Sequence, residues 1–193
     1  MLLYKVKESN KKHLNVVETS LIEDLKNPKT QQKAFRQLVS TYKERLYWHI
    51  RRMVTSHDDA DDVLQNTFIK VFRSIDKFKG DSKLYSWMYR IATNESITFI
   101  NQRAKKSGIS SEELQDHLVN NLQADVYFEG EEIQLKLQKA IAKLPQKQQL
   151  VFNMKYFDDI TYNEMSEILD TSVGALKASY HHAVKKIENF LTD

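Results

Sequence analysis

Residues 161–187, TYNEMSEILDTSVGALKASYHHAVKKI, decide the fold of the C-terminal part of this chain. Apolar side chains recur there at helical spacing, which predicts two helices over 161–169 and 173–191 with a short turn between them. Thr161 and Glu164 stand three residues apart and match the capping-box pattern of a helix start. Two helices joined by such a turn are typical of a helix-turn-helix, so the segment predicts binding to duplex DNA.

The second helix of such a unit enters the major groove, where its outer face reads base edges. Lys177, Lys185 and Lys186 would supply positive charge to the phosphates. The residues expected nearest the DNA are Ser172, Gly174, Ala175, Lys177, Ala178, Ser179, His181, His182 and Lys185. The two histidines are adjacent, and neighbouring helical residues point about 100° apart, so we expect no zinc site.

Composition extends the helical prediction to all 193 residues. Glycine (4) and proline (2) are too scarce for the many turns of an all-β protein, and a hydrophobic share of 41% argues against wholesale disorder. The absence of cysteine excludes disulfides and thiolate metal sites. No apolar run reaches the length of a signal peptide or a transmembrane helix, so we expect a cytoplasmic protein without membrane insertion.

Within residues 31–106, apolar residues at spacings of three and four predict three further helices. The first covers residues 31–54. The second opens with the carboxylates of residues 58–62, which suit the positive end of a helix dipole. We expect Asp81 or Ser82 to cap the third helix, and Gly108 to end it.

These helices group into two small domains. Residues 1–30 form an N-terminal extension, 31–106 a first helical domain, 107–130 a flexible linker, and 131–193 a second domain that contains the helix-turn-helix. The linker lacks periodicity and carries five acidic residues and no lysine or arginine, and so long a loop is unusual inside one compact domain. Residues 18–106 carry 17 lysines and arginines against 11 acidic residues, which suits a phosphate backbone or an anionic membrane surface. The expected fold is therefore all-α, with two small helical domains joined by a flexible acidic linker.

Residues 78–106 interleave aromatic and basic side chains. Aromatic rings can stack on unpaired bases while lysines and arginines follow the backbone, which is how single strands are bound. Trp87 and Phe99 also lie in phase with the apolar stripe of the predicted helix, so a place in the core is an alternative for both.

In this order and spacing the segments resemble the sigma factors of bacterial RNA polymerase, the sigma-70 family. Residues 61–78, DDVLQNTFIKVFRSIDKF, are similar to the sigma helix that docks on the polymerase clamp. Residues 78–101 are similar to the part that melts and reads the minus-ten promoter element, and residues 133–187 to the domain that reads the minus-thirty-five element. Larger sigma factors have a domain between these two that finds no counterpart here, which points to the extracytoplasmic-function (ECF) group.

The resemblance implies contact residues at the matching positions. Polymerase contacts would come from Asp61, Asp62, Gln65, Asn66, Phe68, Lys70 and Arg73. In the family, the turn before the third helix helps hold a flipped-out base and the helix lines the path of the non-template strand. The matching positions are Gly80, Asp81, Ser82, Lys83, Tyr85, Ser86, Tyr89, Arg90, Thr93, Asn94 and Ile97. The recognition helix reads GALKAS at 174–179 where the family commonly has Gly-Thr-Val-Lys-Ser-Arg, so the minus-thirty-five preference of better-known members does not carry over.

The implied function is that of a promoter-specificity subunit without catalytic activity or a cofactor. Its implied partners are core RNA polymerase, through the beta-prime clamp and the beta flap, promoter DNA, and an anti-sigma factor.

Three other classes of protein fit parts of the sequence. A stand-alone helix-turn-helix regulator would bind duplex DNA without polymerase. A helical enzyme would use Asp58–Asp62 to bind magnesium, yet such chemistry needs carboxylates around a deep pocket, and here they occupy one helical turn. A protein that binds only other proteins would show no salt-dependent DNA binding.

Overall fold

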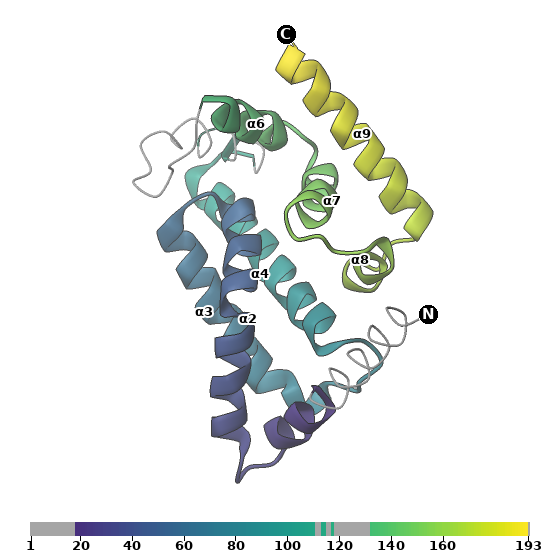
Figure 1. Ribbon diagram of the computed structural model, residues 1–193. Helices are drawn as coiled ribbons and strands as arrows, with labels where there is room; N and C mark the ends of the chain where they lie inside the picture. Colours follow the sequence, from purple (N-terminus) through teal and green to yellow (C-terminus); the bar gives the residue numbers. More distant parts are fainter. Residues whose placement is uncertain (1–17, 111–112, 115–116, 118–131, 193) are drawn as a thin grey trace, which may run out of the picture.

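A computed structural model describes residues 18–110, 113–114, 117 and 132–192 of the chain (Figure 1). Regular structure within these residues is helical throughout, without a strand, as the sequence predicts. In the same residues, no helix combines the length and the apolar character needed to cross a membrane.

Three long helices form the N-terminal lobe, which we define as residues 18–110. They are α2 (Gln31–Val54), α3 (His57–Ser74) and α4 (Leu84–Ser107), and the short 3-10 helix η1 (Ile75–Lys77) follows α3. Leu38, Leu46 and Ile50 of α2 are fully buried against apolar residues of α3 and α4. Residues 18–26 are also helical, and their Leu21 and Leu25 join the same core.

The ends of these helices confirm some of the expected caps and correct another. Gly108 ends α4 in the left-handed conformation with φ 69°, as predicted. The prediction that Asp81 or Ser82 caps α4 is wrong, because Lys83 holds the cap position and makes no side-chain cap hydrogen bond. The acceptor comes instead from another helix, since the Leu84 amide donates to Glu18 Oε1 at 2.5 Å.

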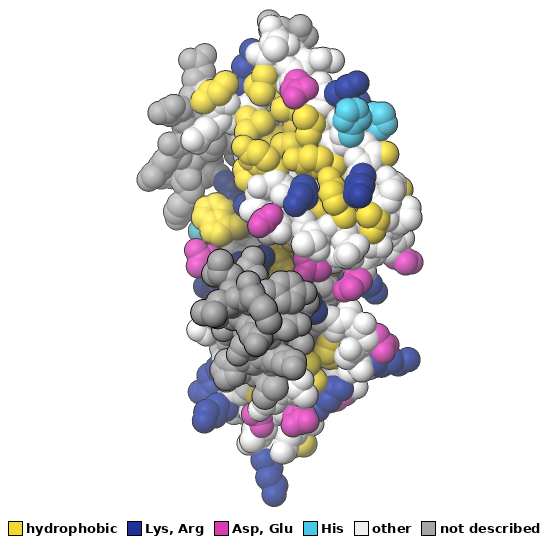
Figure 2. Space-filling view, turned by 45° about the vertical axis from the view of Figure 1, so that its right-hand side comes forward, with side chains coloured by type: hydrophobic (Ala, Val, Ile, Leu, Met, Phe, Trp, Pro, Cys, Tyr) yellow, Lys and Arg dark blue, Asp and Glu magenta, His cyan; other side chains and the backbone are white. Residues whose placement is uncertain are grey.

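The C-terminal lobe, residues 132–192, contains α6 (Glu132–Ala142), α7 (Gln146–Tyr156), α8 (Tyr162–Leu169) and α9 (Val173–Thr192). Its own small core combines Ile141, Phe152 and Ile187 with their apolar neighbours. The Phe152 ring stacks on Tyr180 with centroids 5.8 Å apart. Figure 2 shows hydrophobic side chains gathered on this lobe, in the upper part of the view, while basic and acidic side chains both lie around the lower, N-terminal lobe.

The two lobes are packed against each other. In Figure 1, α7 and α8 lie beside the N-terminal lobe, where α8 contacts α4 and α7 contacts α2, while α9 lies on the outer side. Leu150, Met154, Ile160 and Met165 of the C-terminal lobe belong to the same buried cluster as the core of the N-terminal lobe. Most of the predicted linker, residues 111–112, 115–116 and 118–130, lies outside the described residues. The lobes thus share a core, which the sequence does not predict.

Candidate nucleic-acid interface

The turn of residues 78–83 positions the start of α4. Phe78 is buried and its ring lies 5.1 Å from that of Trp87, while Lys26 Nζ donates to the Phe78 carbonyl at 2.6 Å. Gly80 has φ 81°, a conformation that side chains disfavour. A cavity of about 440 Å³ opens beside this turn, lined by Glu18, Thr19, Ile22, Glu23, Gly80, Ser82 and Lys83. Four of these seven residues come from the helix of residues 18–26, for which the sequence suggests no role.

The candidate strand-binding residues of α4 divide into exposed and buried groups. Lys83, Arg90 and Asn94 are exposed, and Tyr85 and Ile97 are half-buried. Ser86, Tyr89 and Thr93 are buried, so their side chains are not open to a strand in this conformation. Trp87 and Phe99 are half-buried and pack against the core, the alternative that their phase suggests.

Burial and charge both affect the ionisable groups of this face. Burial raises the pKa of Tyr89 far above its ordinary value, and burial likewise raises the pKa of Tyr85. The hydrogen bond to the Glu164 carboxylate raises the pKa of Lys83. For Glu164 itself, burial acts to raise the pKa, but hydrogen bonds from Lys83 and Thr161 outweigh it and the pKa is lowered. Lys83 and Glu164 are therefore a charged pair at neutral pH.

The helix-turn-helix has the predicted local geometry. Thr161 and Glu164 form the capping box at the start of α8, and Asp170 ends α8 with φ 48°. The Ala175 amide donates to Ser172 Oγ at 3.3 Å, so Ser172 caps α9. Of the remaining residues expected nearest DNA, Ser179 is half-buried and the others are exposed: Gly174, Ala175, Lys177, Ala178, His181, His182 and Lys185. Leu176, Ala183 and Ile187 occupy the buried side of the same helix.

The candidate polymerase-binding residues lie mostly on the exposed side of α3. Asp61, Asp62, Gln65, Asn66, Lys70 and Arg73 are all exposed. Lys70 forms an ion pair with Glu95 of α4. Phe68 differs from the others, because it is buried in the core and its ring meets Phe35 edge-on. Two apolar side chains, Ile69 and Phe72, are 40% and 39% exposed beside this polar face.

The acidic run of residues 58–62 has structural partners. Asp59 pairs with Arg103 of α4, and the Asp59 amide donates to Ser56 Oγ at the cap of α3. Within the described part of the chain, no group of three or more potential ligands is arranged to hold a metal ion.

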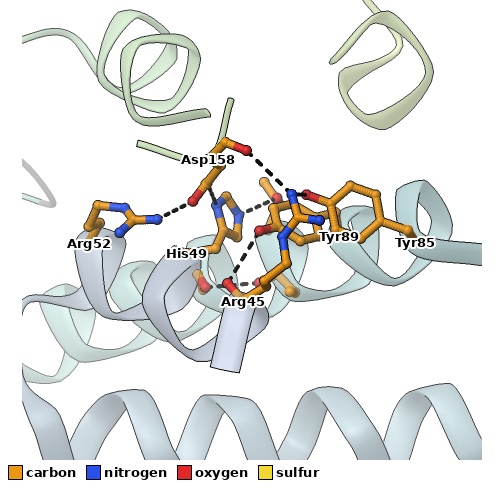
Figure 3. A network of polar contacts seen from close by, with 9 residues as sticks. Arg45, His49, Arg52, Tyr85, Tyr89 and Asp158 are labelled. Carbon is orange, nitrogen blue, oxygen red and sulfur yellow. Dashed lines mark hydrogen bonds and ion pairs between the residues drawn. The ribbon is translucent and has the colours of Figure 1, made fainter. Parts of the chain in front are cut away.

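One polar network was not suggested by the sequence (Figure 3). Asp158, from the loop after α7, points into the N-terminal lobe, where its carboxylate contacts His49 Nδ1 at 3.1 Å and the Arg52 guanidinium. His49 is fully buried and its Nε2 lies 2.9 Å from Thr93 Oγ1. Arg45 donates to the Tyr85 hydroxyl at 2.9 Å and to the Asp158 carbonyl at 3.4 Å.

Comparisons with known proteins match these two lobes separately. The chain matches the family Sigma-70 region 2 over residues 38–106 and the family Sigma-70, region 4 over residues 134–187. It is 32% identical over 173 residues to the ECF RNA polymerase sigma factor SigW of Bacillus subtilis (strain 168), covering 86% of this chain and 92% of that protein. This chain belongs to the sigma-70 family, in its ECF group. It is a sigma factor, which directs RNA polymerase to promoters.

Further relatives agree with this ECF sigma factor assignment. The ECF RNA polymerase sigma-E factor of Haemophilus influenzae is 31% identical over 165 residues, covering 81% of this chain and 87% of that protein. Among solved structures, CnrH in complex with the cytosolic domain of CnrY has a TM-score of 0.65 at 21% identity and covers 91% of this chain and 97% of that one. The sigma factor RpoE of Bartonella quintana, in complex with the anti-sigma factor NepR, has a TM-score of 0.64 at 20% identity and covers 83% and 98%. At such identities the two structures establish a shared fold.

Proposed function

We propose that the two lobes of this sigma factor divide promoter recognition between them. The region 2-like domain, residues 31–106, would bind core polymerase and the minus-ten element, and the region 4-like domain, residues 131–193, the minus-thirty-five element. The observation that carries this division is the face of α9. Gly174, Lys177 and His181 are exposed on it, and α9 is the second helix of a helix-turn-helix whose first helix, α8, begins with a capping box.

The N-terminal lobe would dock on polymerase through α3. Its exposed acids, amides and basic residues form a polar face, and the half-exposed Ile69 and Phe72 beside it offer the apolar contact that interfaces commonly bury. We assign this face to the beta-prime clamp. Phe68 is assigned a packing role rather than a direct contact, because its side chain is 8% exposed.

The melted minus-ten strand would run from the turn at Gly80 along α4. Lys83 and Arg90 supply charge for the phosphates, and Tyr85 supplies a ring for stacking on a base. The cavity beside Gly80 and Ser82 offers a place for an extruded base, which needs a protein pocket because unstacking costs a few kcal/mol.

The C-terminal lobe would meet both duplex DNA and the polymerase. α9 would lie in the major groove, with Lys177 and Lys185 near phosphates. The apolar side chains that Figure 2 shows on this lobe are a candidate surface for the beta flap. Tyr156, 58% exposed, belongs to the stacked aromatic group of this lobe.

We further infer a cytoplasmic protein without catalytic activity that is regulated by an anti-sigma factor. The relatives are sigma factors, which are not enzymes. Support for the regulator comes from the solved relatives, one of which is a complex with an anti-sigma factor and the other with a cytosolic domain of a partner protein.

Run-off transcription tests the proposal. Purified core polymerase and this chain, incubated with genomic promoter fragments of the host, are expected to give discrete transcripts that core alone does not give. A stand-alone regulator would bind duplex fragments but start no transcript when it is the sole factor added. That result would overturn the proposed function.

A further inference from the structure

The helix of residues 18–26 lies beside the turn of residues 78–83, the turn that we assign to an extruded base. Leu21 and Leu25 fix this helix to the N-terminal lobe, because both are buried in the core of that lobe, at 8% and 1% exposure. A helix anchored in this way holds its remaining side chains at fixed positions relative to the turn. It can therefore support residues that have no regular structure of their own.

Two hydrogen bonds join this helix to the two ends of the turn. Lys26 Nζ donates to the Phe78 carbonyl at 2.6 Å. The Leu84 amide, at the start of α4, donates to Glu18 Oε1 at 2.5 Å. Residues 79–83, between these two points, adopt neither helix nor strand. The path of the turn therefore depends on where its ends are held, and one helix holds both ends.

Glu18 acts as a helix cap that comes from a separate element. The first amides of a helix have no partner within the helix, and Lys83, at the cap position of α4, makes no side-chain cap hydrogen bond. The helix dipole favours a carboxylate at this end, and a charged acceptor makes a stronger hydrogen bond than a neutral one. Loss of the Glu18 acceptor would free the first turn of α4 together with the end of the loop that precedes it.

The cavity of about 440 Å³ lies between the helix and the turn, so that each forms one of its walls. Its volume falls within the ~300–1,000 Å³ of typical small-molecule sites, which leaves room for a base. The helix wall includes two acidic residues, Glu18 and Glu23, whereas the turn contributes Lys83. Because carboxylates repel a phosphate and an ammonium group attracts it, this arrangement favours a base inside the cavity and the backbone on the side of Lys83.

We propose that the helix of residues 18–26 is one wall of the pocket for the extruded base, and that Glu18 and Lys26 are positioning residues that hold the opposite wall in place. They act through their hydrogen bonds to Leu84 and Phe78, which keep the turn at a fixed distance from the helix. The inference rests on the proposed strand-binding role of the turn and α4, but its first test measures the turn alone.

Pulsed electron paramagnetic resonance on the full chain measures how firmly the turn is held. The chain has no cysteine, so nitroxide labels at Ser20→Cys on the helix and Asp81→Cys in the turn, both exposed positions, report a single distance distribution. Glu18→Ala and Lys26→Met each remove one of the two hydrogen bonds. We expect each of these substitutions to broaden the distance distribution.

Matched variants separate the hydrogen bonds from other effects of substitution. Glu18→Gln keeps an acceptor for the Leu84 amide, so it should retain the parental distribution. Lys26→Arg keeps a donor for the Phe78 carbonyl and should do the same. Asp24→Ala is the control on the same helix, because Asp24 is exposed and is not among the residues that line the cavity.

Holoenzyme assembled from core polymerase and each variant tests the pocket. The probes are two duplexes with a central melted segment, one with random bases in the non-template strand and one with abasic sites there. The template strand of that segment is abasic in both, so neither can re-anneal. The ratio of the two affinities reports what the bases contribute beyond the phosphates.

Glu18→Ala and Lys26→Met are expected to lower this ratio about fivefold, the lower end of what one stacked base contributes, with no change in affinity for the abasic probe. Glu18→Gln, Lys26→Arg and Asp24→Ala are expected to stay within about twofold of the parent, as for ordinary surface substitutions.

Three results would overturn the proposal: an unchanged distance distribution in Glu18→Ala or in Lys26→Met, equal broadening in Glu18→Gln and Glu18→Ala, or broadening with an unchanged affinity ratio. If Glu18→Ala does not fold, as judged by circular dichroism, Lys26→Met and Lys26→Arg decide by the same two measurements, because this lysine is exposed. Run-off transcription by the parent chain is scored independently. Transcripts with an unchanged distance distribution refute only this inference, and a broadened distribution without transcripts refutes only the proposed function.

Discussion

Asn66 and Phe68 of α3 allow the polymerase-docking assignment to be separated from folding. Both residues fall in the segment similar to the clamp-binding helix, yet Asn66 is exposed whereas Phe68 is 8% exposed and packs edge-on against Phe35 with centroids 6.2 Å apart. A combined substitution would mix two effects. We therefore predict opposite outcomes for Asn66→Ala and Phe68→Ala.

The structure sets the expected magnitudes. Truncation of a buried phenylalanine to alanine costs about 3–5 kcal/mol, which is a large part of the ~5–15 kcal/mol that keeps a typical protein folded. The Asn66 side chain contributes little to the fold, so its removal should change the free energy of unfolding by less than about 0.5 kcal/mol. At an interface the same truncation should cost about 1–2 kcal/mol, which weakens core binding roughly 5- to 30-fold.

Urea unfolding followed by circular dichroism gives the stability, and titration of labelled chain with core polymerase gives the affinity. Gln102→Ala, an exposed amide on α4 outside the assigned surface, is the control for both. If Asn66→Ala binds core as tightly as the control, Asn66 is not part of the docking surface. If Phe68→Ala unfolds at the parental urea concentration, Phe68 does not have the assigned packing role.

Three further outcomes follow from the two lobes. Lys177→Ala should weaken binding to minus-thirty-five duplex and should lower the slope of log affinity against log salt concentration by about one. An unchanged slope would show that Lys177 does not contact a phosphate. Thr161→Ala removes an observed helix cap and should lower the free energy of urea unfolding by about 1 kcal/mol relative to Thr192→Ala, a result that an unshifted midpoint would contradict. A double-mutant cycle on Lys83 and Glu164 should give a coupling of about 0.2–1 kcal/mol, small because the lysine is half exposed. That coupling energy should be constant between pH 4.5 and pH 10.5, the ordinary pKa values of the two groups. It should be lost as pH falls through the lowered pKa of Glu164, or as pH rises through the raised pKa of Lys83. A coupling energy that changes between about pH 6 and 9 would contradict the assignment of this charged pair.

Local rules are sufficient for much of this fold because they depend on neighbours in sequence. The capping box of Thr161 and Glu164 and the C-terminal Gly108 are each determined within a few residues, and the structure has them where the sequence predicts. The first long helix also begins and ends as its apolar spacing indicates, at Gln31–Val54.

Prediction failed where the decisive partner is distant in sequence. The backbone amide of Leu84, at the N-terminus of α4, donates a hydrogen bond to Glu18, 66 residues away. The nearby Asp81 and Ser82 were therefore the wrong candidates for the helix cap. The spacing of apolar residues also does not predict which side chains of α4 are buried. This helix packs against α2 and α3 on one side and against α8 on another, so little of its surface is exposed to solvent. Tyr89 and Thr93 are buried for this reason.

The sequence predicts only part of the candidate site, because some of its contacts join residues that are distant in sequence. Exposed positions on α3 and α9 follow from helical phase, since each of these helices has one clearly buried side. Nothing near Asp158 in sequence indicates that it meets His49, 109 residues earlier, and a loop acid after a helix is ordinarily solvated. Contacts of this kind require the tertiary arrangement of both lobes.

The two faces that we assign to DNA differ in how open they are to solvent, and this difference has a consequence for the order of events. The assigned residues of α9 are exposed on the outer side of the C-terminal lobe, whereas Lys83, Arg90 and Thr93 of α4 are engaged by that lobe or its partners. Under these assignments duplex DNA can be recognised without any rearrangement, but a melted strand cannot reach its full set of contacts until the Asp158 network opens. If core polymerase docks on α3 as proposed, it would use a surface with which the C-terminal lobe makes few contacts, so it could bind first and provide the binding energy that separates the lobes. Strand capture would then be coupled to assembly of the holoenzyme, so the free chain would not hold single-stranded DNA on its own.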